Sequence, residues 1–192
     1  RNNDVVEFTR NITADGFMIR VSDTIKNNSK RDFSFAPYTR VLRAGDKTSS
    51  AGVYTGAIAY VNNDIEHNDW RSLDKKSYAY TTTNGFVGFA DQYWESVAQI
   101  DSPDQTIRMK KQGDLYDASS AAAPVVVAAG GTKIITTNVF AGPRDAHILS
   151  GAESTINGIV ESVYYGWFWF LARPMLWSIN AIHKFVMNYG IS

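Results

Sequence analysis

Apolar and polar side chains alternate along much of the chain between Val5 and Ala141, and this two-residue period is typical of β-strands. The alternation is clear in residues 17–22, which read FMIRVS. Further runs of strand character cover residues 33–35, 53–61, 78–83, 86–100, 106–110, 125–129 and 134–140. Strands of this kind, separated by turn signals, predict a mainly β fold of the sandwich type.

Pairs of Asn, Asp and Gly mark the expected turns, because these residues tolerate positive φ angles. Asp15-Gly16 predicts a type I′ hairpin turn, and Asn84-Gly85 is the strongest short hairpin signal in the chain. The small, featureless residues 119–124, SSAAAP, predict a loop. Further turns are expected at residues 27–29, 62–64 and 130–131.

The pattern changes after Gly142, where strand alternation stops. Pro143 suits the entry to a helix. The apolar residues that follow fit a helical stripe loosely: Ile148, Leu149, Ile156, Ile159, Val160 and Val163. Gly151 and Gly158 weaken this helix by about 1 kcal/mol each. We therefore divide the chain into a sandwich over residues 1–143, a helical linker over 144–163 and an aromatic segment over 164–192.

The aromatic segment, residues 164–192, contains nine aromatic side chains and three of the five tryptophans. Its longest uninterrupted apolar run, Trp167–Ala172, is far shorter than the about 20 residues that cross a bilayer. From Pro174 onward, apolar side chains follow helical spacing: Met175, Leu176, Ile179, Ile182, Phe185, Val186 and Tyr189. This spacing predicts an amphipathic helix of about four turns with proline in its first turn.

Burying the apolar face of that helix would be worth on the order of 10–20 kcal/mol, so the helix needs a surface to lie on. Either it packs on the sandwich or it lies in the plane of a membrane interface. Tryptophan and tyrosine favour the headgroup level of a bilayer, and Arg173 and Lys184 can reach lipid phosphates. We expect the membrane interface. The residues expected to lie there are Trp167, Phe168, Trp169, Phe170, Arg173, Pro174, Met175, Leu176, Ile179, Ile182 and Phe185.

Composition excludes some classes of function but does not identify one. The 192 residues allow one domain with a sizeable core. Nineteen basic and 19 acidic side chains give a formal net charge of zero, so no overall field favours nucleic acid. The chain has no cysteine, which excludes disulfides and thiolate metal sites. Arg1 is not an initiator methionine and no signal-peptide pattern follows it, so we expect the chain to be part of a longer protein.

Few residues offer catalytic or metal-binding chemistry. His67 and Asp69 would share one face of a strand, but two ligands are too few for a closed zinc site, and a polar hairpin edge is the simpler interpretation. Asp101 and Asp104 flank Pro103 and are better read as turn residues than as a glycosidase pair. The sequence shows no nucleophile elbow and no phosphate loop. No metal and no cofactor are expected. Residues 11–13 and 27–29 match the glycosylation pattern, which is common by chance.

Three stretches resemble the YidC/Oxa/Alb family of membrane protein insertases. The first is residues 84–94, NGFVGFADQYW, which looks like a strand-and-turn signature of that family. The second is residues 140–143, FAGP, which looks like its last periplasmic strand turning toward a helix. The third is residues 165–170, YGWFWF, followed by Pro174, by the pair at 182–183 and by the triplet at 188–190. The similarity is closest from Asn84 to the end and looser before Leu73.

The resemblance implies a β-supersandwich like that of galactose mutarotases, followed by helices. It implies a periplasmic domain on the outer side of the bacterial inner membrane, whose first part would precede Arg1 and whose transmembrane core would follow Ser192. The family inserts nascent membrane proteins, alone or with the Sec translocon. We therefore expect a docking and anchoring domain that is not an enzyme. Its expected partners are the lipid bilayer surface, Sec components and nascent membrane proteins, and no nucleic acid.

Two alternatives remain beside this interpretation. A mutarotase-like or carbohydrate-binding sandwich would need a histidine and a carboxylate in a cleft, for which His67 with Glu66 or Asp69 are the nearest candidates. Fold alone does not transfer function, however. A protein-interaction surface on an exposed strand edge or apolar groove is the other alternative, and the sequence does not identify the strand.

Overall fold

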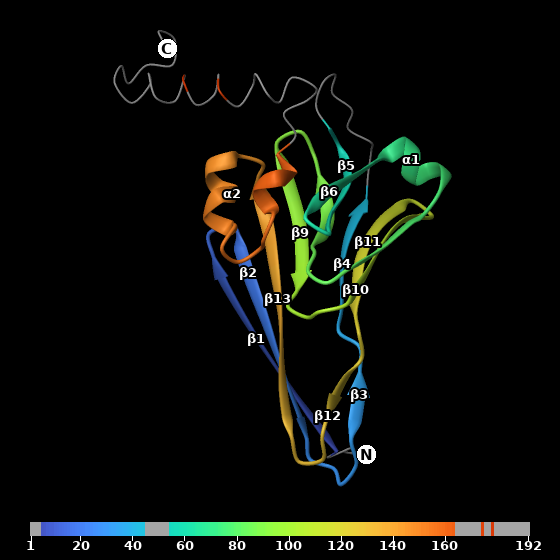
Figure 1. Ribbon diagram of the computed structural model, residues 1–192, viewed down its shortest axis with the longest axis vertical. Helices are drawn as coiled ribbons and strands as arrows, with labels where there is room; N and C mark the ends of the chain where they lie inside the picture. The colour runs from blue at the N-terminus through green and yellow to red at the C-terminus, as the bar shows by residue number, and fades with distance from the viewer. Residues whose placement is uncertain (1–4, 45–53, 164–173, 175–177, 179–192) are drawn as a thin grey trace.

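The computed structural model describes residues 5–44 and 54–163, together with the single residues 174 and 178. The described part is an elongated antiparallel β structure (Figure 1). Its largest sheet has seven strands in the order β1-β2-β13-β9-β8-β5-β6. These strands are β1 (Val6–Asp15), β2 (Met18–Asn27), β13 (Thr132–Pro143), β9 (Trp94–Ile100), β8 (Val87–Ala90), β5 (Gly56–Val61) and β6 (Asp64–Asp69).

A four-stranded sheet packs against one half of this large sheet, and a two-stranded sheet continues below it (Figure 1). The four strands, in spatial order, are β4 (Tyr38–Ala44), β11 (Leu115–Ala122), β10 (Gln105–Gln112) and β7 (Tyr78–Thr82). The small sheet pairs β12 (Val125–Val127) with β3 (Phe33–Phe35). The expectation of a mainly β sandwich is therefore confirmed.

The core between the sheets is formed by the alternating side chains of their facing surfaces. Ala57, Ala59, Val87 and Phe89 come from the seven-stranded sheet, and Ile107, Met109, Tyr116 and Ala118 from the four-stranded sheet. The short helix α1 (Trp70–Lys75), which the sequence pattern did not predict, adds Trp70 and Leu73 to this cluster. Asp69 caps α1 by accepting a hydrogen bond from the backbone N–H of Ser72 at 2.8 Å.

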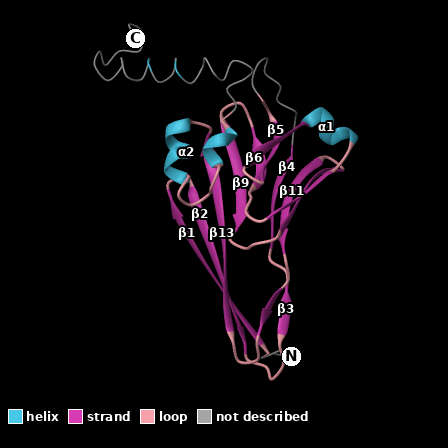
Figure 2. Ribbon diagram, in the orientation of Figure 1, coloured by secondary structure: helices cyan, strands magenta, loops and turns pink. Residues whose placement is uncertain are grey.

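The opposite face of the seven-stranded sheet is covered by α2 (Ala146–Ala152) and the 3₁₀ helix η1 (Ile159–Ser162). Together with α1, they gather at one end of the molecule (Figure 2). Leu149, Ile156 and Ile159 are fully buried against Ile58 and Phe140 of the sheet. No helix in the described part is long and apolar enough to cross a membrane.

The helical linker expected over residues 144–163 is not one continuous helix. Pro143 ends β13 instead of opening the helix, and Asp145 is the N-cap of α2. The helix stops at Ala152, and Gly158, at φ +81°, starts a separate turn of 3₁₀ helix. A left-handed residue cannot continue an α-helix, so Gly158 keeps η1 separate from the turns that follow α2.

The loop expected at residues 119–124 is also wrong for most of its length, because Ser119 to Ala122 belong to β11. This strand lies between β4 and β10, and Ser119 and Ser120 are buried. Small side chains resemble a loop in the sequence, yet these residues lie in a central strand that pairs on both sides. Ser120 Oγ donates a hydrogen bond to Gln105 Oε1 at 2.9 Å, which satisfies its hydroxyl inside the core.

Asn84-Gly85 does not form a hairpin. The strands before and after it, β7 and β8, belong to different sheets, so the pair lies in a crossover. Gly85 has no positive φ angle. Instead, a Cβ atom at this position would lie 2.3 Å from the carbonyl oxygen of Tyr60, so glycine is required by close packing.

The hairpin expected at Asp15-Gly16 exists, but its turn type differs. Asp15 pairs with Met18, so Gly16 and Phe17 are the two loop residues, and only Gly16 has a positive φ angle. A type I′ turn needs positive φ at both loop residues. That pattern occurs instead at Asn62 and Asn63, whose φ angles are +52° and +68°, between β5 and β6.

Candidate functional site

The candidate site lies where the sandwich leads toward the aromatic segment. Val163 is the last residue before that segment in the described part, and it follows η1 directly. Four residues connect η1 to the sheet beneath it, and we call them the junction cluster: Tyr54, Glu95, Arg144 and Ser162. Glu95 comes from β9, and Arg144 follows the last residue of β13.

Arg144 joins three separate segments through its guanidinium group. Nη1 donates to the carbonyl oxygen of Tyr54 at 2.9 Å and approaches that of Asp91 at 3.5 Å. Nη2 donates to the carbonyl oxygen of Ser162 at the end of η1. The side chain of Arg144 is only 4% exposed, and burial lowers its pKa from the ordinary value. Because these bonds are buried, they fix the end of η1 relative to both sheet segments.

Glu95 is the acidic partner of this arginine. Its side chain is fully buried, and its Oε2 lies 3.7 Å from Arg144 Nε, too far for a hydrogen bond. Neither Arg144 Nε nor Glu95 Oε1 has a hydrogen-bond partner in the described part of the chain. Burial raises the pKa of Glu95 to about 7, and the hydrogen bond from Ser162 and the charge of Arg144 offset this rise only in part.

The contacts of the Ser162 hydroxyl agree with a protonated Glu95. Its Oγ lies 2.7 Å from Glu95 Oε2 and 2.6 Å from the carbonyl oxygen of Ile159. A serine hydroxyl has one proton, so it can donate to only one of these oxygens. If Glu95 is protonated, it donates to Ser162, which donates to Ile159, and both contacts are satisfied. The geometry and the raised pKa of Glu95 thus agree.

One further contact fixes the junction cluster, and another fixes the start of η1. The ring of Tyr54 packs edge-on against His67, with centroids 4.4 Å apart, and lies 6.0 Å from the Arg144 guanidinium carbon. Burial raises the pKa of Tyr54 and lowers that of His67, so both are held neutral at neutral pH. Gly158 packs against the ring of Tyr60, where a Cβ atom would lie 2.3 Å from a ring carbon.

The alternative acid–base residues do not form a cluster. His67 pairs with Ile58 and Glu66 with Ala59, so the two side chains lie on opposite faces of the sheet. The carboxylate of Asp69 caps α1. Asp101 and Asp104 are exposed residues of the β9–β10 connection, in keeping with their interpretation as turn residues.

The two glycosylation patterns differ in exposure. Asn11 is exposed on β1. Asn27 is fully buried, and its side-chain nitrogen donates to the carbonyl oxygens of Arg31 and Val127 at 2.7 and 3.0 Å. Its Oδ1 accepts from the backbone N–H of Ser29 at 3.0 Å, which forms the turn that the sequence predicted. Asn27 is therefore a structural residue.

The residues predicted to lie at the membrane interface fall outside the described part, with one exception. Pro174 is helical and exposed, and Ser178, one turn later, is helical and partly buried. The others, which stay predictions, are Trp167, Phe168, Trp169, Phe170, Arg173, Met175, Leu176, Ile179, Ile182 and Phe185.

Residues 1–178 match the family model described as the YidC periplasmic domain. The chain belongs to this family. It therefore lies on the periplasmic side of the inner membrane, as the resemblance implied, and the match agrees with the expectation that it is not an enzyme. The residues that identify the family run from the sandwich through the junction cluster into the aromatic segment.

Full-length relatives give the same assignment. The chain is 28% identical over 203 residues to the membrane protein insertase YidC of Maricaulis maris, covering 97% of this chain and 34% of that protein. It is 29% identical over 205 residues to the YidC insertase of Mesorhizobium japonicum, covering 100% of this chain and 34% of that protein. The chain thus spans about a third of the length of the curated relatives it matches.

Solved structures of low sequence identity share the fold. A putative aldose 1-epimerase from Klebsiella pneumoniae superimposes with a TM-score of 0.50 at 9% identity, covering 75% of this chain and 47% of that one. The Slr1438 protein of Synechocystis gives a TM-score of 0.50 at 9% identity, covering 71% and 55%. These likenesses support the mutarotase-like arrangement of sheets and nothing about activity.

Sequence reasoning missed the junction cluster. One signal was present: Glu95 stands in a strand that is otherwise mainly apolar toward its end, WESVAQI, where a carboxylate needs a buried partner. Nothing in the sequence pointed to Arg144 as that partner, because the two residues are 49 positions apart (144 − 95) and meet only through the pairing of β13 with β9.

Proposed function

We propose that the chain is the docking and anchoring domain of a membrane protein insertase, acting without catalysis of its own. In this proposal residues 1–143 form the sandwich, residues 144–163 connect it to the membrane-facing part, and residues 164–192 lie along the outer surface of the bilayer. The whole protein would insert nascent membrane proteins, alone or with Sec components. Family membership and the pattern of the aromatic segment support this assignment.

The junction cluster is the observation that carries the anchoring role. The connection over residues 144–163 is packed on the sheet through Leu149, Ile156 and Ile159, and Arg144 holds its last turn. A connection held in this way keeps its last described residue, Val163, at a fixed place on the sheet, whereas a flexible linker would allow the domain to rotate freely. The cluster therefore suits a domain whose height and tilt above a membrane matter.

Liposome flotation tests the interfacial segment. The intact chain should float with vesicles that contain anionic lipid, and a chain lacking Pro174–Ser192 should not. Trp167→Ser combined with Trp169→Ser should weaken flotation, because tryptophan anchors at the headgroup level. Phe8→Ser is the control, since Phe8 is 57% exposed on β1 and lies outside the segment and the junction cluster, so flotation should not change. The proposal fails if the intact and shortened chains both stay with the lipid-free fraction.

A further inference from the structure

The outer face of the four-stranded sheet carries a trough that the family assignment does not explain. Its floor is β11, where Ser119 and Ala121 present small side chains between the longer residues of the neighbouring strands β4 and β10. The associated cavity has a volume of about 480 Å³. We call it the outer trough. The residues that line it include Tyr38, Asp104, Arg108, Lys110, Ser119 and Ala121.

The strand register places the side chains of this face in rows. Tyr38, Ala121, Thr106 and Thr81 form one row across the four strands. The next row along the strands contains Arg40, Ser119 and Arg108, and the third contains Leu42, Asp117 and Lys110. Asp104, Thr106, Arg108 and Lys110 line the trough at every second position along β10 and the turn before it, so it follows this strand over roughly 17–20 Å. This shape fits a linear chain of about six extended residues better than a compact ligand.

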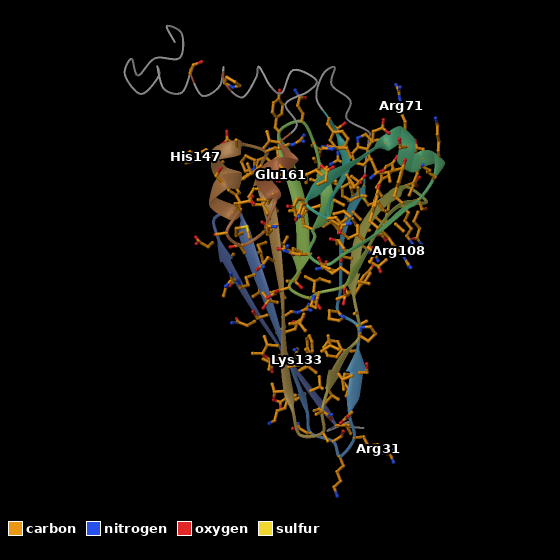
Figure 3. The ribbon with its side chains drawn as sticks, viewed as in Figure 1. Arg31, Arg71, Arg108, Lys133, His147 and Glu161 are labelled. Carbon is orange, nitrogen blue, oxygen red and sulfur yellow. The ribbon has the colours of Figure 1, made fainter. Side chains whose placement is uncertain are left out.

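The charges in the outer trough favour an acidic ligand. Arg108 is exposed on the outer side of the sheet (Figure 3), and Lys110 is partly exposed in the next row. Neither forms an ion pair with a carboxylate of the described residues, and the third cation of this face, Arg40, lies 3.4 Å from Asp117 Oδ2. Asp104 is the only carboxylate that lines the trough. Two cations without acidic partners on one face therefore attract negative charge.

Asp117 is the other carboxylate of this face, opposite Lys110 in the strand register. It does not line the trough, its side chain is 5% exposed, and its Oδ2 lies 3.4 Å from Arg40 Nη2. It therefore offsets the charge of Arg40, and a ligand in the trough meets Arg108 and Lys110 instead.

We propose that the outer trough binds a short, extended, acidic segment of a client membrane protein on the periplasmic side. This inference rests on the proposed insertase function. Short segments on the outer side of a membrane are poor in lysine and arginine, so those that carry acidic side chains meet little repulsion from Arg108 and Lys110. Their carboxylates would pair with Arg108 and Lys110, and Tyr38, which is 56% exposed, would pack against an apolar residue of the segment. Contacts of this kind give weak, transient binding.

A fluorescence anisotropy titration tests the proposal on the full chain. The probe is a labelled peptide of about six residues that alternates glutamate with small apolar residues. A matched peptide with glutamine in place of glutamate is the neutral comparison. The acidic peptide should bind about tenfold or more tightly than the neutral one, and the difference should shrink in about 0.5 M salt, because the pairs are exposed to screening.

Variants that remove the charges of the outer trough test where the acidic peptide binds. Arg108→Gln with Lys110→Gln should weaken binding of the acidic peptide about tenfold. Arg31→Gln with Lys133→Gln is the matched control, since these exposed cations lie toward the other end of the molecule (Figure 3) and should leave binding unchanged. Equal binding of both peptides, or an equal loss in both variant pairs, overturns the proposal. Competition by a neutral oligosaccharide would likewise overturn it, in favour of a saccharide site.

The outcome separates this proposal from the proposed function. Liposome flotation of the intact chain reports on the aromatic segment and does not involve Arg108 or Lys110. If flotation succeeds and the acidic peptide does not bind, the anchoring function stands and the outer trough is not a client site. If the peptide binds at the outer trough but flotation fails, the trough is a peptide site on a domain that does not anchor to lipid.

Discussion

The two halves of the seven-stranded sheet differ in how much of them is covered. Strands β5 and β8 are buried at every position, because the four-stranded sheet covers one face and α2 with η1 cover the other. At the opposite edge, β1 is exposed at nine of its ten positions. Phe8 and Ile12 are 57% and 60% exposed, although Phe8 pairs with Ile25, which is buried in the core. Stability should therefore be concentrated in the β5–β8–β9 half.

The sequences of the two strands reflect this difference. β5 reads GAIAYV, an apolar run without alternation, as expected for a strand covered on both faces. β1 reads VEFTRNITAD, an alternating pattern in which one face of the strand is mainly apolar. Alternation therefore predicts which face of a strand is apolar, but it does not predict whether another layer covers that face. Mutations that compare the two halves test this directly.

Removing the buried cation of the junction cluster should have the largest effect. Arg144→Met leaves Glu95 without a compensating charge and frees the carbonyl oxygens of Tyr54 and Ser162. We expect a loss of about 3–5 kcal/mol in the free energy of unfolding at pH 8, where Glu95 is mostly ionised. Urea unfolding followed by tryptophan fluorescence measures it.

Arg10, in the exposed half of the sheet, is the matched control for Arg144. Arg10 on β1 pairs with Asp23 at 2.7 Å, but its side chain is 52% exposed. Arg10→Met should cost less than about 1 kcal/mol, because solvent screens the pair. Equal losses in the two variants would show that burial does not decide the strength of these pairs.

Shortening a core isoleucine should have the next largest effect. Ile58 on β5 is fully buried, packed in the cluster with Phe140 and Leu149. Ile58→Ala should lower the free energy of unfolding by about 2–5 kcal/mol, through lost apolar burial and the cavity left behind. Ile12→Ala on β1 is the control and should change it by no more than about 0.5 kcal/mol. A large loss at Ile12 would mean that β1 is covered after all.

Neutralising Glu95 should change how stability depends on pH. Its pKa is raised from 4.5 to about 7 in the folded chain, so the folded state binds the proton more tightly than the unfolded state does. The stability gained from this tighter proton binding is fully present below pH 4.5, and it is lost as the pH rises through 7. It amounts to up to about 3 kcal/mol.

Glu95→Gln keeps the shape of the side chain without the titration. The variant should therefore be more stable than the parent at pH 8 by up to about 3 kcal/mol, and the difference should disappear near pH 4.5. Urea unfolding at a series of pH values measures it. Parallel pH profiles of parent and variant would show that Glu95 does not titrate in this range.

The sequence predicted those parts of the fold that depend on local pattern. Alternation located β2, β3 and β7, and Asn and Gly pairs located most of the turns. The sequence patterns failed where tertiary packing determines the structure. Residues 119–122 resemble a loop because they are small, and they form a strand because they pair with β10 on one side and β4 on the other. Asn84-Gly85 resembles a hairpin, but the glycine is required by the carbonyl of Tyr60.

The candidate site was predictable only in part. Family resemblance was carried by short motifs, and it led to the correct family and location. The junction cluster was not predictable, because Arg144 and Glu95 meet through the register of β13 with β9, which no local pattern records. The outer trough was missed for the same reason. Tyr38, Arg108 and Ser119 share a face only once three strands are aligned.

The smallest expected effect separates turn geometry from burial. Asn63, at φ +68°, lies in the turn beside the buried strand β5, and Gly16, at φ +55°, lies in the turn beside the exposed strand β1. Alanine disfavours positive φ wherever it stands, so Asn63→Ala and Gly16→Ala should each cost about 1 kcal/mol in urea unfolding. A Cβ atom at Gly16 would meet no atom within 4 Å, so packing adds nothing there. If Gly16→Ala were neutral while Asn63→Ala was costly, the burial around a turn, and not its backbone conformation, would set the penalty.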